Sequence, residues 1–469
     1  MNAPLLELRA PARSLTWLRS AGGWTFVGGV IFSALAFGSV DPLTTNAEVI
    51  LFAGLALAFG WAPFESTSLA RLHAVALILL ALLLAYLIWQ AKAPAPAWAN
   101  PAWTFLRSWL PEARATVSAA PGMTLGALSP LALPFFVFLS ALSIAQRHGE
   151  AEILWRRLAH FGAVYAAFAL FQEAFFPGQL MFSAKTHYMG AVTGSFVNRN
   201  TAGTFLGLAL LLNLSLLLKA LRRIDFDKWL WGSLASALPA GEKPGTLALR
   251  SLTVLMVAVA LFLTQSRGAI VSSFVAVLLA VALTAFPVAA APARGAAWRR
   301  AAALGGGLLL VVALFSLFGE RAAYRLQEAD GQDGRWCSFG STLQAISATP
   351  WLGSGFGAFQ DVYPAFRTAA CAGINGVWER AHNGFLEGYL GLGAPFLAVL
   401  AVVYGALGQA LITGLRQRSR LRFVPVATLA ALTLVTLHSV VDFSLQIPGC
   451  AVYFAAIAGC GAAVSLQKR

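Results

Sequence analysis

Apolar stretches long enough to cross a bilayer recur along the whole of this 469-residue chain. The hydrocarbon core of a bilayer is about 30 Å thick, and a helix needs about 20 mainly apolar residues to cross it. The stretches lie at about 23–40, 48–64, 70–91, 129–146, 153–176, 201–220, 247–265, 268–290, 301–319, 384–414, 423–441 and 448–466. With 58% hydrophobic and 11% charged residues, the composition is not that of a soluble protein. We predict one all-α, polytopic transmembrane domain of about twelve helices over residues 1–469.

The positive charges lie between the apolar stretches. The chain has 33 Lys and Arg against 19 Asp and Glu, a net charge of +14. If the amino terminus is cytoplasmic, 22 of the basic residues fall in inner connections and 11 in outer ones. This bias follows the positive-inside rule, so both termini are expected in the cytoplasm. Because no basic cluster is interleaved with aromatic side chains in a polar domain, nucleic-acid binding is not supported.

Two long connections fall on the outer, periplasmic side of this topology, at 92–128 and 320–383. The first is rich in Pro, Ala and Trp, which is typical of an interfacial cover with aromatic anchors. The second is polar, and a connection of this length between helices 9 and 10 is usually functional. It contains Cys337 and Cys371. The oxidising periplasm permits a disulfide between them, with two free thiols as the alternative.

Polar residues gather at the outer ends of several predicted helices. They lie in the segments GSFVNRNTAG (194–203), LTQSRGAI (263–270), WERAHNGFLEGYLGLG (378–393) and HSVVDFSLQIPG (438–449). Ionisable residues at membrane depth are costly and are usually functional. Since the topology brings all four segments to one membrane face, we expect a single site there.

The residue types in these segments suit a lipid diphosphate. Arg199 and Arg267 carry guanidinium groups that bind phosphate in a bidentate manner. His382 could remove a proton from a sugar hydroxyl, because an imidazole titrates close to neutral pH. The predicted supporting residues are Asn198, Asn200, Ser266, Arg380 and Asn383. Two arginines can neutralise the leaving diphosphate, and no Asp-x-Asp or Cys/His spacing indicates a metal, so neither metal nor cofactor is predicted.

Structural interpretations of the same residues remain open. Arg199 could extend its side chain to the membrane interface, and Arg267 could be a helix-end cation on a tight turn. Asn383 could cap the helix that follows it. His438 and Asp442, four residues apart, could form a hydrogen bond on one helix face.

The four segments together resemble the O-antigen ligase and polymerase superfamily of bacterial membrane enzymes. The resemblance rests on Gly-x-Phe-x-Asn-x-Asn at 194–200, on Ser266-Arg267-Gly268, and on two stretches of the long loop and the helix after it. These stretches contain Pro350, Gly353, Gly355 and Phe359, and then His382, Asn383, Leu386, Gly391 and Gly393. The resemblance covers roughly 190–450. Gly384 and Gly391 depart from it, since many relatives have an acidic residue there.

The resemblance implies a GT-C-like fold in the bacterial inner membrane, with the active site facing the periplasm. It implies that Arg199 and Arg267 hold the diphosphate of an undecaprenyl-linked glycan while His382 activates the acceptor hydroxyl. Transfer would invert the anomeric carbon without metal or nucleotide. A ligase would transfer the glycan to the lipid A core, and a polymerase would transfer it to a second lipid-linked repeat unit. Membrane lipids are the remaining partners expected, and we favour the ligase.

Two other classes of protein compete with this interpretation. A twelve-helix transporter would place its polar residues at the membrane midplane between repeated halves. A non-catalytic assembly subunit would not need His382. The gathering of polar residues under one long outer loop favours the enzyme.

Overall fold

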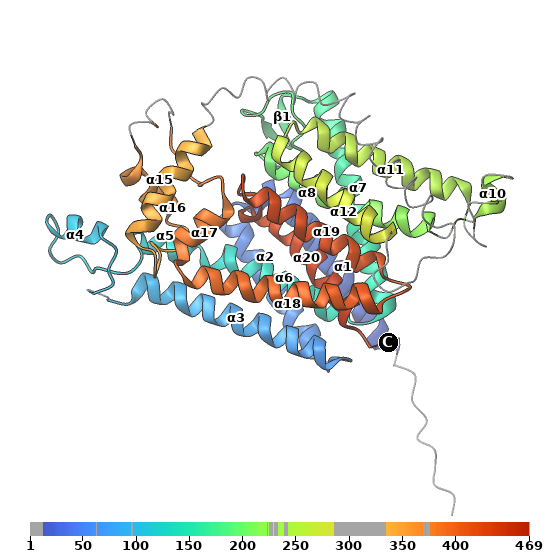
Figure 1. Ribbon diagram of the computed structural model, residues 1–469, viewed down its shortest axis with the longest axis horizontal. Coiled ribbons are helices and arrows are strands. Elements are labelled where there is room, and N and C mark those ends of the chain that lie inside the picture. Colours follow the sequence, from blue (N-terminus) through green and yellow to red (C-terminus); the bar gives the residue numbers. More distant parts are fainter. Residues whose placement is uncertain are drawn as a thin grey trace, which may run out of the picture.

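The computed structural model describes residues 13–61, 63–94, 97–222, 224, 228, 233–238, 243–285, 334–368, 371 and 376–468. Within these ranges the chain is almost entirely helical (Figure 1). The strands β1 (Gln179–Leu180) and β2 (Ser183–Ala184) form one short antiparallel pair. The predicted all-α polytopic membrane fold is therefore confirmed.

Among the described residues, nine helical segments are long and apolar enough to cross a membrane, and two shorter apolar helices accompany them. These eleven helices, of which α1 and α19 contain the two shorter apolar ones, are α1 (Arg13–Leu35), α2 (Pro42–Gly60), α3 (Thr67–Lys92), α6 (Leu128–Ile144), α7 (His148–Phe175), α8 (Arg199–Leu221), α11 (Pro244–Leu263), α12 (Arg267–Ala285), α18 (Pro395–Gln417), α19 (Phe423–Ser439) and α20 (Pro448–Leu466). Each coincides with one of the twelve predicted stretches. The remaining stretch, 301–319, lies outside the described residues.

Short helices lie within the two predicted outer loops. They are α4 (Ala102–Arg107), α5 (Pro121–Gly126), α15 (Gly334–Ala348), α16 (Phe359–Val362) and η2 (Tyr363–Phe366), and the short helix α17 (Gly384–Leu392) follows the second loop. The other short elements are η1 (Phe37–Ser39), α10 (Leu234–Ala237) and η4 (Ser444–Gln446). Because α5 continues into α6, this crossing segment begins at Pro121, earlier than the predicted residue 129. Figure 1 shows α15, α16 and α17 together at one end of the molecule.

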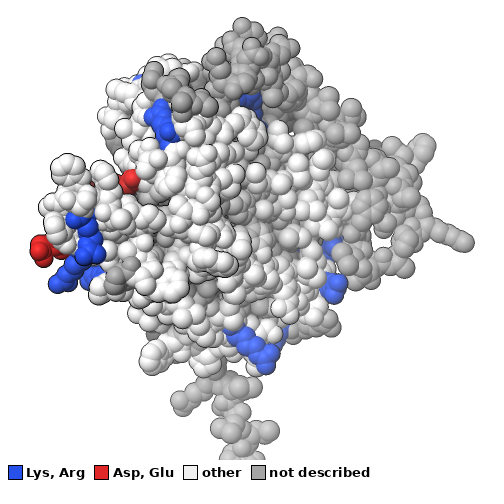
Figure 2. Space-filling model, turned by 60° about the vertical axis from the view of Figure 1, so that its left-hand side comes forward, with Lys and Arg blue, Asp and Glu red and all other residues white. Residues whose placement is uncertain are grey.

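Helix α20 is the most buried of the candidate membrane-spanning helices, because 89% of an 18-residue apolar stretch of this helix is buried inside the protein. Small residues allow its neighbours to approach closely. A Cβ atom at Gly459 would lie 2.5 Å from the Phe138 carbonyl oxygen of α6, and one at Gly449 would lie 2.6 Å from the Ser33 carbonyl oxygen of α1. Around this centre the described surface is a broad uncharged area with Lys and Arg at its margins (Figure 2). A lipid-facing surface has this distribution.

The helix ends form two opposite faces of the bundle. We call the face that contains residues 36–41, 176–198, 264–266 and 440–447 the site end, and the opposite face the basic end. At the basic end, Arg422 donates from Nη1 to the Leu283 carbonyl oxygen (3.0 Å) and from Nε to the Leu415 carbonyl oxygen (3.1 Å). Arginines that bind the last carbonyl groups of helices also complement the helix dipole.

The predicted helix over 384–414 is interrupted, so this prediction is wrong. Helix α17 ends at Leu392, and α18 starts at Pro395. Between them Gly393 has φ +67°, a conformation that side-chain-bearing residues rarely adopt. The proline then starts a new helix, because its fixed φ suits the first turn. The polar start of the predicted helix is thus a separate, short helix at the site end.

The break also lets the segment 349–355 pack directly against the backbone of residues 390–394. Ser354 donates its N–H to the Leu390 carbonyl oxygen (2.7 Å), and Ala394 donates to Trp351 (3.0 Å). From α3, Gln90 donates through Nε2 to the carbonyl oxygens of Leu352 (2.7 Å) and Gly391 (3.0 Å). The glycines of the Pro-x-x-Gly-x-Gly motif therefore allow close contact between two backbones.

Replacing Gly353 by alanine is expected to destabilise the protein by more than about 1 kcal/mol. Gly353 has φ +70°, and an added Cβ would lie 2.6 Å from the backbone nitrogen of Gly393. The thermal unfolding midpoint in detergent measures the effect. Gly405→Ala is the matched control, since a Cβ in that position of α18 meets nothing within 4 Å. Equal midpoints for the two variants would contradict the tight backbone contact.

Candidate active site

A buried hydrogen-bond network joins α8, the turn before α12 and the segment after α19. Asn200 donates through Nδ2 to Asp442 Oδ1 (2.9 Å), and Ser266 Oγ donates to Asn200 Oδ1 (2.8 Å). Ser444 Oγ donates to the second carboxylate oxygen of Asp442. All four residues are buried. We call them the site network. A satisfied buried network of this kind fixes the relative position of the segments that contribute to it.

Helix α19 contributes a second buried contact to α8. His438 Nδ1 and Thr204 Oγ1 are 2.6 Å apart, and the His438 side chain is 2% exposed. A Cβ at Gly268 would lie 2.9 Å from this imidazole. Asp442 lies beyond the end of α19, which is Ser439, so the two residues do not share a helix face. His438 and Asp442 each form a hydrogen bond to a residue of α8. The structure therefore does not contain the hydrogen bond between these two residues that the sequence left open.

The three residues predicted to do the chemistry all adjoin the site network. Arg199 immediately precedes Asn200, and Arg267 immediately follows Ser266. The His382 ring contacts Phe443, the residue after Asp442, with 4.9 Å between ring centroids. Neighbouring Cα atoms are only about 3.8 Å apart, so the network brings these segments together although they are separated by up to about two hundred residues.

Arg199 is the first residue of α8. The preceding Asn198 caps this helix, because its side chain accepts the Asn200 N–H (2.7 Å). The Arg199 guanidinium lies over the Tyr188 ring, 5.2 Å from its centroid, in a cation–π contact. Tyr188 has a positive φ of 57°. The half-buried guanidinium is thus held at the site end by the loop before α8.

The loop 176–198 is itself fixed by buried polar contacts. The buried Lys185 donates to Glu173 (2.7 Å) and to the Ala191 carbonyl oxygen (2.6 Å). Gln265, which has φ +55°, donates from Nε2 to the Gly190 carbonyl oxygen (2.7 Å). The loop next to Arg199 and the turn before Arg267 are therefore connected directly.

Arg267 lines a cavity of about 620 Å³ with Arg335 and Trp336 of α15. The remaining wall is largely apolar and includes Val271, Leu437 and Val440. Arg335 donates from Nη1 to the Val441 carbonyl oxygen (3.2 Å), beside the site network. A cavity with two cations and apolar walls can hold a molecule that has an anionic head and an apolar chain. The sequence pattern did not single out Arg335, which lies in the polar loop without a recognisable motif.

His382 lies in the connection just before α17 with φ +54°, a left-handed conformation that costs about 1–2 kcal/mol for most residues. Contacts on both sides fix this conformation. Ala381 donates its N–H to Glu387 (2.7 Å), and Gly384 donates its N–H to the Asp442 carbonyl oxygen (3.2 Å). The ring packs edge-on against Trp378, with a centroid distance of 5.3 Å. Strained residues held in this way concentrate at functional sites.

Comparison with known families tests the resemblance independently. Residues 252–401 match the family model of the O-antigen ligase. The protein carries an O-antigen ligase domain. No curated protein matches the chain. The predicted superfamily is confirmed. The match supports a transferase of the ligase or polymerase type, with a lipid-linked glycan and an acceptor as its classes of substrate. Together with the apolar helices, it supports a multi-pass membrane protein.

The O-antigen ligase domain contains only part of the candidate site. The matched segment includes Arg267, Arg335 and His382. Arg199 and Asp442 lie outside it, yet the site network joins their segments to the matched one. The candidate site therefore extends beyond the matched residues on both sides.

Two of the predicted supporting residues hold the His382 loop of the ligase domain in place. Asn383 caps α17, because its side chain accepts the N–H groups of Phe385 and Leu386 (both 3.0 Å). Arg380 pairs with Glu387 at 3.3 Å. Burial raises the pKa of Glu387 above its ordinary value, and Arg380 opposes that rise. These contacts favour positioning roles for Arg380 and Asn383.

The structure joins Cys337 of α15 to Cys371 by a disulfide, with Cα atoms 5.7 Å apart. This Cα separation lies in the normal disulfide range. The bond connects α15, and so Arg335 and Trp336, to the later part of the long loop. Among the described residues, no group of three His, Cys, Asp or Glu side chains is placed to hold a metal ion.

Denatured protein is expected to react with alkylating reagent at two cysteines before reduction and at four after it. Cys450 and Cys460 are free and buried, so they account for the first two. Mass spectrometry of the labelled, unfolded chain measures the number of thiols. A Cys337→Ser variant should gain one labelled thiol, at Cys371. Four labelled thiols in the unreduced wild type would contradict the disulfide.

Proposed function

We propose that the protein is an O-antigen ligase of the bacterial inner membrane, with its active site facing the periplasm and both termini in the cytoplasm. It transfers a glycan from undecaprenyl diphosphate to a sugar hydroxyl of the lipid A core. One observation carries the proposal: Arg199, Arg267 and His382 all adjoin the buried network of Asn200, Ser266 and Asp442. The O-antigen ligase family match supports the choice of reaction.

In this proposal Arg199 and Arg267 hold the diphosphate of the donor. Planar guanidinium groups fit phosphate oxygens in a bidentate manner and remain charged at every relevant pH. The cavity beside Arg267 adds the cation of Arg335, and its apolar wall can contact the first isoprene units of the lipid. Residue Arg335 is therefore added to the diphosphate-binding set.

His382 is the proposed catalytic base. Its imidazole accepts the proton of the acceptor hydroxyl while that oxygen attacks the anomeric carbon of the glycan. The bond between the anomeric carbon and the diphosphate oxygen breaks, and its electron pair leaves with undecaprenyl diphosphate. Direct displacement inverts the anomeric carbon. The arginines stabilise the developing negative charge, so the proposal requires neither metal nor cofactor.

A deletion strain tests the proposal. The strain is complemented with wild type or with His382→Ala, and envelope glycans and undecaprenyl-linked material are separated on gels. If the protein is a ligase, the gel ladder of core-linked glycan should be absent from the deletion strain and from the His382→Ala strain. Full-length glycan should accumulate on undecaprenyl diphosphate in both strains.

Two other outcomes would overturn the assignment. Single repeat units in place of long chains would identify a polymerase, to which the segment HSVVDFSLQIP (438–448) also bears some likeness. If neither pool changes and His382→Ala behaves as wild type, the enzymatic assignment fails and a transporter becomes the better interpretation.

A further inference from the structure

An exposed apolar hairpin follows α7 at the site end. Its strands β1 and β2 lie within residues 176–185, and Phe182, in the turn between them, is 95% exposed. Phe176, where this segment begins, is 48% exposed. The one charged residue of the segment, Lys185, is buried. An exposed apolar patch without charge marks the binding surface of a partner or of a membrane.

The hairpin is fixed beside the last turn of α7. Gln172 donates from Nε2 to the Gln179 carbonyl oxygen (3.1 Å), and the Met181 N–H donates to Gln172 Oε1 (3.3 Å). Lys185 donates to Glu173 (2.7 Å). Since Gln172 and Glu173 both belong to the last turn of α7, the hairpin folds back along this helix. Its tip therefore has a fixed depth relative to α7.

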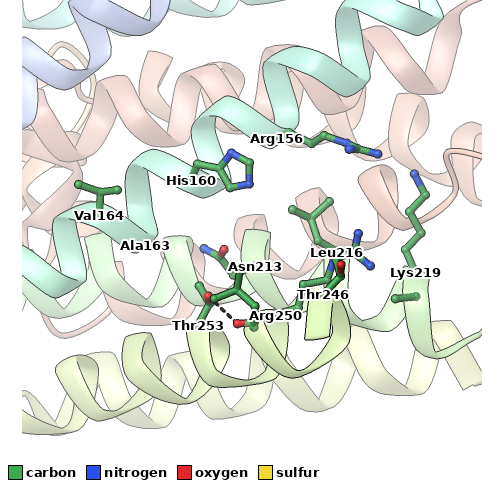
Figure 3. A pocket seen from close by; sticks show the side chains of 12 residues that line it. Arg156, His160, Ala163, Val164, Asn213, Leu216, Lys219, Thr246, Arg250 and Thr253 are labelled. Atoms are coloured by element: carbon green, nitrogen blue, oxygen red, sulfur yellow. Dashed lines mark hydrogen bonds between the residues drawn. The ribbon is translucent and has the colours of Figure 1, made fainter. Parts of the chain in front are cut away.

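The lipid-facing side of α7 is continuous with the hairpin. Val164, Phe171 and Phe175 have the spacing of one helix face, and each is more than half exposed. Figure 3 shows Val164 further along α7 than Arg156. The Phe171 ring contacts the rings of Phe175 and Phe176, with 4.8 and 6.0 Å between centroids. An apolar strip thus connects the flank of α7 to the start of the hairpin.

The length of α7 places the hairpin within the hydrocarbon layer. The Arg157 guanidinium lies over the exposed Trp24 ring, 3.8 Å from its centroid, and such a pair is typical of a membrane interface. Phe175 follows Arg157, the last Lys or Arg of α7, by 18 residues or about 27 Å, and the hydrocarbon layer is about 30 Å thick. Charged side chains at that depth must pair, as Lys185 and Glu173 do. The end of α7 and the hairpin beside it therefore lie at the depth of acyl chains.

We propose that the hairpin 176–185 inserts into the bilayer leaflet at the site end, with the rings of Phe176 and Phe182 among the acyl chains of bilayer lipids. Continuity with the apolar strip of α7 selects acyl chains over a soluble protein as the occupant. The inserted hairpin anchors the loop 176–198, in which Tyr188 lies over the Arg199 guanidinium. It thereby sets the depth of Arg199 in the membrane. Insertion depends only on the membrane location of the protein, so its test is independent of the transferase activity.

The accessibility of a spin label in lipid vesicles tests the proposal. Full-length Phe182→Cys protein is labelled with a nitroxide and reconstituted with phosphatidylcholine and phosphatidylglycerol. The label goes to the new cysteine, because Cys337 and Cys371 are bonded and Cys450 and Cys460 are buried. Power saturation measures collisions of the label with oxygen, which concentrates among acyl chains, and with a nickel chelate, which stays in water. The label at residue 182 is expected to collide more with oxygen than with nickel.

Two further labelled variants are the matched controls. Val164→Cys reports on the lipid-facing flank of α7, and Asp361→Cys replaces an exposed, charged residue of α16 that faces water. The oxygen-to-nickel ratio at residue 182 should resemble the ratio at 164 and exceed the ratio at 361 several-fold. A ratio at 182 equal to that at 361 would overturn the proposal, since the tip would then lie in water, where a soluble partner could cover it.

The variants Phe182→Asp and Phe182→Leu test the same insertion without a label. A carboxylate among acyl chains is costly, whereas leucine remains apolar. In the same vesicles, Phe182→Asp should unfold about 2–4 °C below wild type, and Phe182→Leu should unfold at the wild-type temperature. A turn in water tolerates both substitutions, so equal midpoints for the two variants would also overturn the proposal.

Discussion

Replacing His382 by asparagine is expected to reduce glycan transfer by about 10²- to 10⁴-fold, the usual contribution of a general base. Asparagine is chosen because it tolerates positive φ better than most residues. His382 has φ +54°, so this substitution removes the imidazole and retains the backbone conformation. Transfer is measured with purified protein, a lipid-linked glycan donor and a core acceptor.

The control for this prediction is His160→Asn. His160 lies on α7, does not line the cavity that contains Arg267, and is not part of the proposed chemistry. Both variants should keep the thermal unfolding midpoint of wild type, and only His382→Asn should lose activity. Retained transfer in a folded His382→Asn variant would contradict the base assignment and leave a structural role for this residue.

The pH dependence provides a second measurement of the same assignment. An imidazole acts as a base only in its neutral form, so transfer should fall as the pH is lowered from about 8 to about 5. In His382→Asn the residual activity should lose this dependence. A profile in wild type that is flat over this range would contradict a histidine base.

The helix positions could be predicted from the sequence because membrane spans depend mainly on length and apolar composition, which are local properties. The convergence of Arg199, Arg267 and His382 followed from topology alone, since helix ends on one side of a membrane meet at one face. Sequence reasoning assigned Asn200 only as a supporting residue, whereas the structure places it at the centre of the site network. Its partner, Asp442, is 242 residues away, and hydrogen-bond partners at such distances cannot be read from local patterns.

Other features depended on backbone geometry that composition does not specify. The break at Gly393 makes room for the close approach of Gly353, and this contact depends on how the long loop folds back onto α17. Glu387 is one acidic residue among several in the sequence, and its bonds to Ala381 and Arg380 make it a support for His382. The segment 378–393 thus contains both the proposed catalytic base and residues that hold its backbone.

Residues with strained backbone conformations also lie at the site end. Three residues with positive φ, namely Tyr188, Gln265 and His382, lie beside Arg199, Arg267 and the site network, respectively. Each costs free energy that other contacts must offset. Their concentration at one end of a helical bundle favours a site there over a merely structural interface.

Replacing Arg267 by lysine is expected to reduce transfer by roughly 30- to 150-fold, although the charge is retained. Lysine cannot form the two parallel hydrogen bonds of a guanidinium with a phosphate, and the loss of one charge-assisted bond costs about 2–3 kcal/mol. If the diphosphate is held more tightly as it departs, kcat should fall more than the affinity for the donor. Steady-state kinetics with a lipid-linked donor measure the two parameters separately.

Arg250→Lys is the matched control for this substitution, because Arg250 lies on α11 and does not line the cavity that contains Arg267. It should transfer glycan at the wild-type rate, and both variants should unfold at the wild-type temperature. A folded Arg267→Lys variant with full activity would show that a single positive charge suffices at this position, which contradicts the diphosphate clamp. A change in donor affinity with no change in kcat would instead place Arg267 in ground-state binding, so the charge stabilisation in the transition state would have to come from Arg199 and Arg335.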